Sequence, residues 1–164
     1  MSRLSIPDLG PRGEGWVAGQ MILLVANGAL GLLALPATWG APGYLHGLQA
    51  VAGGLLMLIG FLSAVLGIRD LGPNLTATPR PRAGADLVSG GIYARLRHPI
   101  YAGLIEGSIG WAGFTASVPA FFAAAALAVW LDLKARREER WLVEHYPGYA
   151  DYRARTHRFV PGLY

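Results

Sequence analysis

Residues 16–36 read WVAGQMILLVANGALGLLALP and residues 44–68 read YLHGLQAVAGGLLMLIGFLSAVLGI, and neither stretch contains a charged side chain. Each is long enough to supply the roughly 20 residues with which a helix crosses about 30 Å of hydrocarbon. Of the 164 residues, 53% are hydrophobic and 15% are charged, whereas about a quarter is charged in ordinary soluble domains. The sequence therefore predicts an integral membrane protein that contacts the lipid bilayer.

A third apolar stretch, residues 100–131, is too long for one crossing and is interrupted near Ser117 and Pro119. Ser117 has the residue type of an N-cap, and proline is tolerated in the first turn that follows. We therefore expect a helical hairpin, whose second helix continues to His145, where Tyr146-Pro147-Gly148 ends it. The predicted fold is all-α and polytopic, a single membrane domain over residues 1–164. Its expected segments are helices at 16–36, 44–68, 99–115 and 118–145, a loop at 69–98 and a tail at 146–164.

The basic residues predict the orientation. All fourteen Lys and Arg residues lie in the N-terminal segment, the long loop, the end of the last long helix or the tail. With four crossings these segments share one side, which the positive-inside rule makes the cytoplasm. Both termini, the loop and a helical extension at the C-terminal end are therefore expected to face the cytoplasm.

Glycines are placed where close packing between two of these helices would need them. Gly53, Gly60 and Gly67 recur at heptad spacing, and Gly103 and Gly107 have the small-xxx-small spacing, with Gly110 and Gly113 nearby. In lipid, small residues let helix backbones approach each other for van der Waals contact. We expect these two glycine faces to pack closely.

Several classes of site have no support in the sequence. The absence of cysteine excludes disulfides and thiolate metal sites, and the histidines have no partners at metal-ligand spacing. Phosphate-binding loops, dinucleotide fingerprints and metalloprotease motifs are absent as well. The basic tail lacks an independent fold for binding nucleic acid. Neither a metal nor a nucleic-acid partner is expected.

The densest polar cluster surrounds the start of the hairpin's first helix, where Arg97, His98 and Tyr101 flank Pro99. Proline suits the first position of a helix. His98 would then lie at the positive end of the helix dipole, where a ligand carboxylate can bind. Alternatively, Arg97 and His98 anchor the chain to lipid headgroups.

Three glutamates are further candidates. Glu138 and Glu139 are adjacent on a helix and point about 100° apart, since a helix has 3.6 residues per turn. One could face a cationic ligand while the other pairs with Arg136, Arg137 or Arg140, or both could belong to a solvated helix end. Glu106 lies inside an apolar helix, where a carboxylate is costly unless it faces a cavity or a partner. It could line a substrate pocket, or bond a neighbouring helix.

These residues together resemble a known family. Arg97-His98-Pro99-Ile100-Tyr101-Ala102-Gly103, followed by an apolar stretch and Glu138-Glu139, is similar to the RHPxYxG–hydrophobic–EE pattern of isoprenylcysteine carboxyl methyltransferases. The same pattern occurs in their phospholipid N-methyltransferase relatives. The resemblance covers about residues 70–161. It includes Tyr149-xx-Tyr152 and the basic segment that follows it, which ends at Pro161.

The resemblance implies a cytoplasm-facing pocket for S-adenosylmethionine and a lipophilic acceptor that enters from the bilayer. It implies that the cofactor-binding residues are Tyr93, Leu96, Arg97, His98, Pro99, Tyr101, Gly103, Glu138 and Glu139. Arg155 would be the catalytic residue that holds an acidic acceptor, and Glu106 or a glutamate of the Glu138-Glu139 pair could accept a proton from an amine. The expected reaction is O-methylation of an isoprenylcysteine-like carboxylate. The alternatives are N-methylation of a phospholipid or other lipid amine, and a non-enzymatic membrane protein or small transporter subunit.

Overall fold

The computed structural model describes residues 6–39, 44–80 and 84–163 of the chain. Across these ranges the chain is all-helical, as predicted, and forms no β-strand beyond one isolated bridge between Leu96 and His157. The helices are α1 (Glu14–Trp39), α2 (Tyr44–Leu71), α3 (Pro99–Phe114), α4 (Val118–His145) and α5 (Tyr149–Arg155). Two short 3-10 helices, Gly72–Asn74 and Gly91–Ala94, lie in the long loop.

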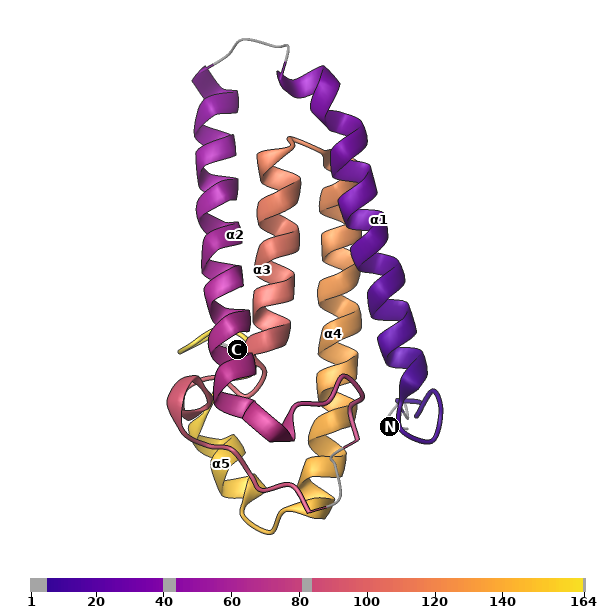
Figure 1. Ribbon diagram of the computed structural model, residues 1–164, viewed down its shortest axis with the longest axis vertical. Coiled ribbons are helices and arrows are strands. Elements are labelled where there is room, and N and C mark those ends of the chain that lie inside the picture. The colour runs from indigo at the N-terminus through magenta and orange to yellow at the C-terminus, as the bar shows by residue number, and fades with distance from the viewer. Residues whose placement is uncertain (1–5, 40–43, 81–83, 164) are drawn as a thin grey trace.

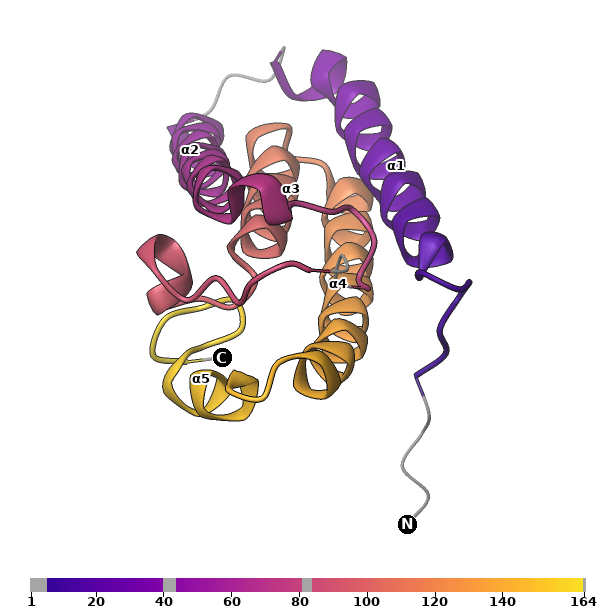
Figure 2. The same ribbon diagram turned by 60° about the horizontal axis from the view of Figure 1, so that its bottom comes forward.

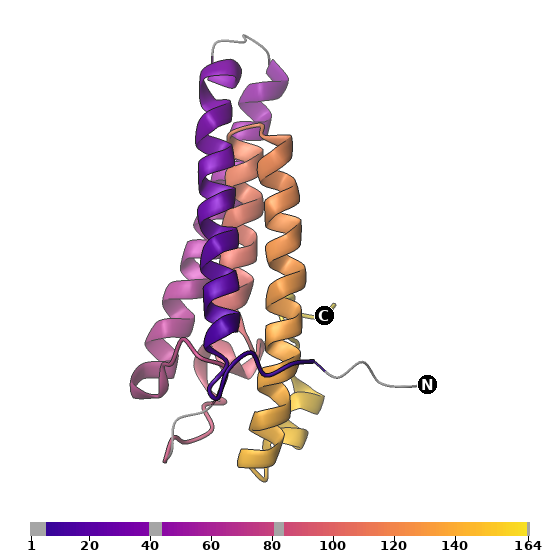
Figure 3. The same ribbon diagram turned by 90° about the vertical axis from the view of Figure 1, so that its right-hand side faces the viewer.

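The four long helices lie side by side, with α3 between α2 and α4 and with α1 along α4 (Figure 1). The turn that joins α3 to α4 lies well short of the far ends of α1 and α2 (Figures 1 and 3). Residues 72–80 and 84–98, α5 and the described part of the tail all gather at the opposite end, which we call the loop end. Nearly all charged side chains belong to this end, because residues 15–68 contain none and residues 99–131 contain only Glu106.

The predicted helix limits are close to those observed. The hairpin's second helix has the predicted bounds, and Ser117 caps it by accepting a hydrogen bond from the backbone N–H of Ala120 at 3.2 Å. The first two helices are longer than their uncharged runs, because turns carrying Glu14 or Arg69 and Asp70 also belong to them. Helix α5 was not predicted. It falls within the segment that the sequence describes only as a basic tail.

Within the described residues, three helices are long and apolar enough to cross a membrane, over Glu14–Leu35, His46–Asn74 and Val118–His145. Large apolar side chains on them are exposed, including those of Val25, Phe61 and Phe122. These features indicate an integral membrane protein. Helix α3 has 16 residues, about 24 Å of helix against a hydrocarbon core of about 30 Å. A fourth full crossing is therefore not confirmed.

Helices α2 and α3 pack backbone against backbone at glycines. A Cβ atom on Gly60 would lie 2.6 Å from the carbonyl oxygen of Gly103, and one on Gly110 would lie 2.7 Å from that of Gly53. Any other residue at these positions would push the helices apart. Around Gly107 a Cβ atom would meet nothing within 4 Å. Of the predicted glycine face of α3, Gly103 and Gly110 therefore make the close approach, and a Cβ atom on Gly107 would be free of it.

Helix α1 is held to the hairpin by polar groups that bridge between helices. The amide of Asn27 donates hydrogen bonds to the backbone carbonyls of Ala120, at 2.8 Å, and Ser108, at 3.3 Å. The indoles of Trp16 and Trp130 lie 4.8 Å apart, centroid to centroid. These contacts hold α3 and α4 against α1 within the bundle. They therefore fix the positions of α3 and α4 relative to each other at the loop end as well.

Candidate functional site

The tail binds the chain just before α3 through backbone hydrogen bonds. The N–H of Arg97 donates to the carbonyl of His157 at 2.8 Å, and the N–H of His98 donates to that of Arg158 at 3.2 Å. In return the N–H of His157 donates to the carbonyl of Arg95 at 3.0 Å. Figure 2 shows α5 and the tail beside this segment at the loop end. The pairing fixes the start of α3 against the tail.

An ionic cluster reinforces this connection. Glu139 on α4 is only 2% exposed. Its Oε1 atom accepts hydrogen bonds from Arg97 Nε at 2.9 Å and Arg158 Nε at 3.1 Å, and its Oε2 lies 3.1 Å from Arg158 Nη2. Arg158 also reaches Asp132 Oδ1 at 2.8 Å, two turns earlier on α4. Glu139 therefore ties α3, α4 and the tail together.

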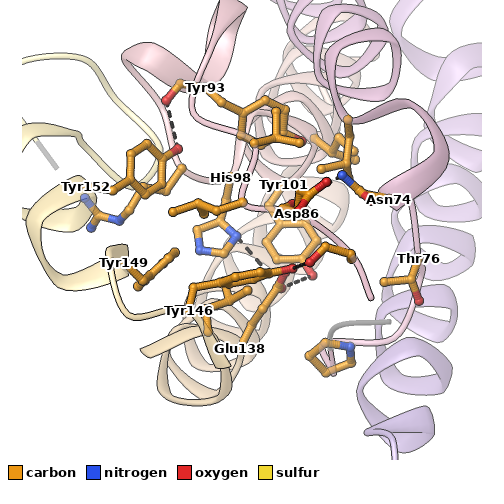
Figure 4. A pocket seen from close by; sticks show the side chains of 18 residues that line it. Asn74, Thr76, Asp86, Tyr93, His98, Tyr101, Glu138, Tyr146, Tyr149 and Tyr152 are labelled. Atoms are coloured by element: carbon orange, nitrogen blue, oxygen red, sulfur yellow. Dashed lines mark hydrogen bonds and ion pairs between the residues drawn. The ribbon is translucent and has the colours of Figure 1, made fainter. Parts of the chain in front are cut away.

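The neighbouring Glu138 has different surroundings, as the sequence predicts for adjacent helical residues. Its Oε2 accepts a hydrogen bond from the Tyr101 hydroxyl at 2.7 Å and lies 3.9 Å from His98 Nδ1. The rings of His98 and Tyr101 are stacked, with centroids 5.2 Å apart. Figure 4 shows these three side chains converging on one cavity. Glu138 is partly exposed to that cavity, whereas Glu139 is buried behind it.

This loop-end cavity has an empty volume of about 780 Å³, which includes space open to solvent. Its walls come from the long loop, the start of α3, the end of α4 and α5. It is lined by Leu71, Asn74, Thr76, Pro79, Ala85, Asp86, Leu87, Val88, Tyr93, Arg97, His98, Ile100, Tyr101, Glu138, Leu142, Tyr146, Tyr149 and Tyr152.

Two polar groups at the cavity are buried without a hydrogen bond to any described residue. They are the Nε2 atom of His98 and the hydroxyl of Tyr149. His98 Nε2 lies 3.3 Å from Glu139 Oε1, but the geometry is not that of a hydrogen bond. His98 Nε2 therefore faces the Glu139 carboxylate, whereas the Tyr149 hydroxyl has no hydrogen bond to a described residue, which is unusual because buried polar groups in proteins are nearly always paired.

Tyrosines hold the loop and tail around the cavity. The Tyr93 hydroxyl donates to the carbonyl of Gly67 at 3.3 Å, and the Tyr152 hydroxyl donates to that of Tyr93 at 2.8 Å. Tyr146 donates to the carbonyl of Ala85, also at 2.8 Å. Burial raises the pKa of Tyr93, and it raises the pKa of Tyr152 to about 12. Both phenols therefore remain protonated donors at neutral pH.

Five of the nine cofactor residues expected from the resemblance line the loop-end cavity: Tyr93, Arg97, His98, Tyr101 and Glu138. The other four lie outside its lining. Leu96 and Pro99 are buried near the start of α3, Gly103 packs on α2, and Glu139 belongs to the ionic cluster.

The two expected catalytic residues are not brought to this cavity. Arg155 is exposed on α5, where its Nε donates to the carbonyl of Asp151 at 3.2 Å. Glu106 lines a second cavity, between α3 and α4, and its carboxylate is hydrogen-bonded to Ser63 of α2. The alternative expectation for Glu106, a bond to a neighbouring helix, is therefore met by Ser63.

Sequence reasoning missed several residues of the site. Asn74, Thr76 and Asp86 line the cavity from a loop with no periodic pattern. Tyr149 was noted only as part of the resemblance. Arg158 contacts Glu139, which lies 19 residues earlier in the sequence. No feature of the sequence distinguishes Arg158 from the other arginines of the tail.

A family model described as phospholipid methyltransferase matches residues 48–148, which is more than half of the chain. The chain belongs to the phospholipid methyltransferase family. The matched residues include the start of α3 and the end of α4, so they contain His98, Tyr101 and Glu138. Membership supports a membrane methyltransferase in general, and the family generally uses S-adenosylmethionine as methyl donor.

Two curated proteins are similar to part of this family member. It is 38% identical over 84 residues to the cobalt-zinc-cadmium resistance protein CzcN of Cupriavidus metallidurans. It is 34% identical over 83 residues to the nickel-cobalt-cadmium resistance protein NccN of Alcaligenes xylosoxydans xylosoxydans. Each match covers 50% of this chain but only 38% and 39% of the respective relative. The matched part is therefore well under two thirds of either relative.

Proposed function

We propose that the protein is an S-adenosylmethionine-dependent membrane methyltransferase that binds its cofactor in the loop-end cavity and methylates a lipophilic amine. One observation carries the cofactor assignment. The cavity combines the Glu138 carboxylate and the His98 imidazole, which lies against Glu139, with the buried Tyr149 hydroxyl, which makes no hydrogen bond to any described residue.

The lining fits the charges of the cofactor, which carries an ammonium, a carboxylate and a sulfonium and supplies the methyl group. Glu138, supported by Tyr101, would hold the ammonium or the ribose hydroxyls. His98, at the N-terminal end of α3, would hold the carboxylate, because helix N-termini attract anions. Glu139 is already bound by two arginines, so its proposed role is to position Arg97 and the tail rather than to contact the cofactor.

The charge distribution favours an amine as acceptor over a carboxylate. A carboxylate would need a cation to hold it, but Arg155 lies outside the cavity lining and Arg97 is paired with Glu139. The cavity offers two carboxylates instead, Glu138 and Asp86. An amine is protonated at neutral pH and becomes nucleophilic only when it loses that proton. One carboxylate would hold the cofactor, and the other would accept the proton.

The proposed orientation places the loop end, both termini and the cavity in the cytoplasm. It is supported by the fourteen Lys and Arg residues, which the sequence confines to segments at that end. S-adenosylmethionine is a soluble cofactor, and in this orientation it would reach the cavity from the cytoplasm without crossing the bilayer. The acceptor would arrive through the lipid.

Calorimetric titration of the detergent-purified protein with S-adenosylhomocysteine tests the cofactor site. Wild type is expected to bind. Glu138→Gln and His98→Ala should each weaken binding by about 10- to 150-fold, the equivalent of about 1.5–3 kcal/mol for a charged hydrogen bond. Glu144→Gln, an exposed change on the same helix, is the matched control. Absence of wild-type binding at millimolar ligand would refute the cofactor assignment.

The pH dependence of methyl transfer tests the acceptor class. With saturating cofactor, transfer to a long-chain amine should rise with pH up to the pKa of the amine, because only the neutral amine is nucleophilic. Transfer to a carboxylate should be level above about pH 6, since carboxyl groups are ionised there. A preparation that methylates prenylated or fatty acids but no lipid amine would contradict the proposed acceptor.

A further inference from the structure

A second cavity lies between α3 and α4 on the membrane side of the tail. It has an empty volume of about 800 Å³. It is lined by Ala102, Ile105, Glu106, Ala128, Val129, Asp132, Leu133, Phe159 and Val160. The lining is almost wholly apolar, and Val129, Leu133 and Val160 at its edge are exposed. In a membrane protein these exposed side chains open the α3–α4 cavity toward lipid acyl chains.

Glu106 is the exceptional group in this cavity. It is seven residues into α3, about 10 Å along the helix axis from the helix start. Its carboxyl group is hydrogen-bonded to Ser63 of α2. Its Oε2 atom is buried and makes no hydrogen bond to any residue that the structure describes. A carboxyl group at such depth is costly unless it has a partner.

The other carboxylate of the lining is engaged elsewhere. Asp132 pairs with Arg136 and with Arg158, at 2.5 and 2.8 Å. Glu106 is therefore the group that can recognise the polar end of an occupant. A carboxyl group can bind an ammonium or another donor, whereas it repels a carboxylate or a phosphate.

The α3–α4 cavity also adjoins the loop-end cavity. Phe159 lines the former and His98 lines the latter, and their rings make an edge contact with centroids 6.2 Å apart. On α3, Tyr101 lines one cavity and Ala102 lines the other. A ligand held in the α3–α4 cavity thus lies one side-chain layer from the proposed cofactor site.

From these observations we infer that the α3–α4 cavity is a loading site for an amphiphilic amine, with Glu106 binding the ammonium and the apolar lining binding the chain. The inference rests on the proposed function in one respect, since it identifies this ligand as the acceptor. Charge complementarity selects the amine: an alcohol of equal length fills the same apolar space without neutralising Glu106, and a fatty acid places two acidic groups together. Glu106 is thereby a specificity-determining residue.

Photolabelling in lipid nanodiscs tests the site with defined probes. Three 16-carbon chains with a mid-chain diazirine are compared, ending in an amine, an alcohol or a carboxylic acid. The amine should label peptides of α3 and α4 saturably, and unlabelled hexadecylamine should compete. Glu106→Gln should weaken its apparent affinity about tenfold or more, the effect of losing a charged hydrogen bond. Glu144→Gln should leave it unchanged.

A second variant keeps Glu106 but fills the space. Ala128→Phe should abolish labelling of the α3–α4 cavity while binding of S-adenosylhomocysteine, measured on the same sample, is retained. Equal labelling by amine and alcohol, or an unchanged affinity in Glu106→Gln, would overturn the inference. If S-adenosylhomocysteine binds but the amine is not selected over the alcohol, the loading site alone is refuted. Amine selectivity without cofactor binding leaves the site standing and removes the proposed methyltransferase.

Discussion

Replacing Glu139 by glutamine should destabilise the protein far more than the same change at Glu138, although the two residues are adjacent. Glu139 accepts three hydrogen bonds from two arginines in a buried setting, with side-chain exposures of 3% for Glu139 and 9% for Arg97. Glu138 faces the loop-end cavity and accepts one hydrogen bond, from Tyr101. The isosteric change removes the charge at either position and leaves the volume unchanged.

The expected magnitude follows from what each change leaves behind. Removing one partner of a buried ion pair costs about 3–5 kcal/mol. Arg158 retains Asp132 after the change, and Arg97 retains the carbonyl of Arg153, so we expect a loss near the lower limit, about 3 kcal/mol. Glu138→Gln should cost about 1 kcal/mol or less, the contribution of an ordinary hydrogen bond.

Unfolding of both variants by sodium dodecyl sulfate in mixed micelles, followed by circular dichroism, measures the difference. Titration of the same preparations with S-adenosylhomocysteine should give the reverse order. The affinity of Glu138→Gln for this ligand should fall more than the affinity of the folded part of the Glu139→Gln preparation. Equal stability of the two variants would refute the assignment of Glu139 to the framework of the site.

Three further predictions concern packing, pH and topology. Gly60→Ala should destabilise the bundle by about 1–3 kcal/mol relative to Gly54→Ala in the same unfolding assay. The reason is that a Cβ atom on Gly60 meets the α3 backbone, whereas one on Gly54 meets nothing within 4 Å. Equal stabilities of the two variants would contradict close α2–α3 packing. The folded-state pKa of Tyr152, about 12, exceeds the unfolded value of about 10, so its contribution to stability is full below pH 10 and is lost as the pH rises from about 10 to 12. Tyr152→Phe should flatten that decline in a pH series of unfolding curves, and an unchanged slope would exclude Tyr152 as its source. In intact cells, a cysteine replacing Thr76 should resist an impermeant thiol reagent and one replacing Ala41 should react; the opposite pattern would reverse the proposed orientation.

Local sequence signals were sufficient to predict the four long helices. Apolar run length identified α1 and α2, and the Ser117 cap with Pro119 identified the start of α4, because each signal acts within a few residues of its effect. The ends of α1 and α2 extend beyond the uncharged runs, since charged residues can occupy the last turn of a helix at the water interface. Helix α5 has only seven residues, too few for a hydrophobic period to be recognised.

The site depended on contacts that sequence spacing cannot reveal. The adjacent glutamates were expected to separate, and they do, but which one faces the cavity follows from the approach of Arg97 and Arg158. Arg155 was selected on resemblance and Arg158 was not considered, although the backbone pairing at His157 turns Arg158 toward α4. The three-residue difference decides which arginine binds Glu139.

The pairing of residues 156–158 with 95–98 has a consequence for how the protein is made. Those tail residues leave the ribosome after all four long helices have been synthesised, yet they supply Arg158 to Glu139 and the backbone partners of Arg97 and His98. A nascent chain with its helices already in the membrane still lacks one wall of the loop-end cavity. The proposed cofactor site is therefore completed only after residues 156–158 have been synthesised, and a chain released before Thr156 should insert without becoming competent to bind the cofactor.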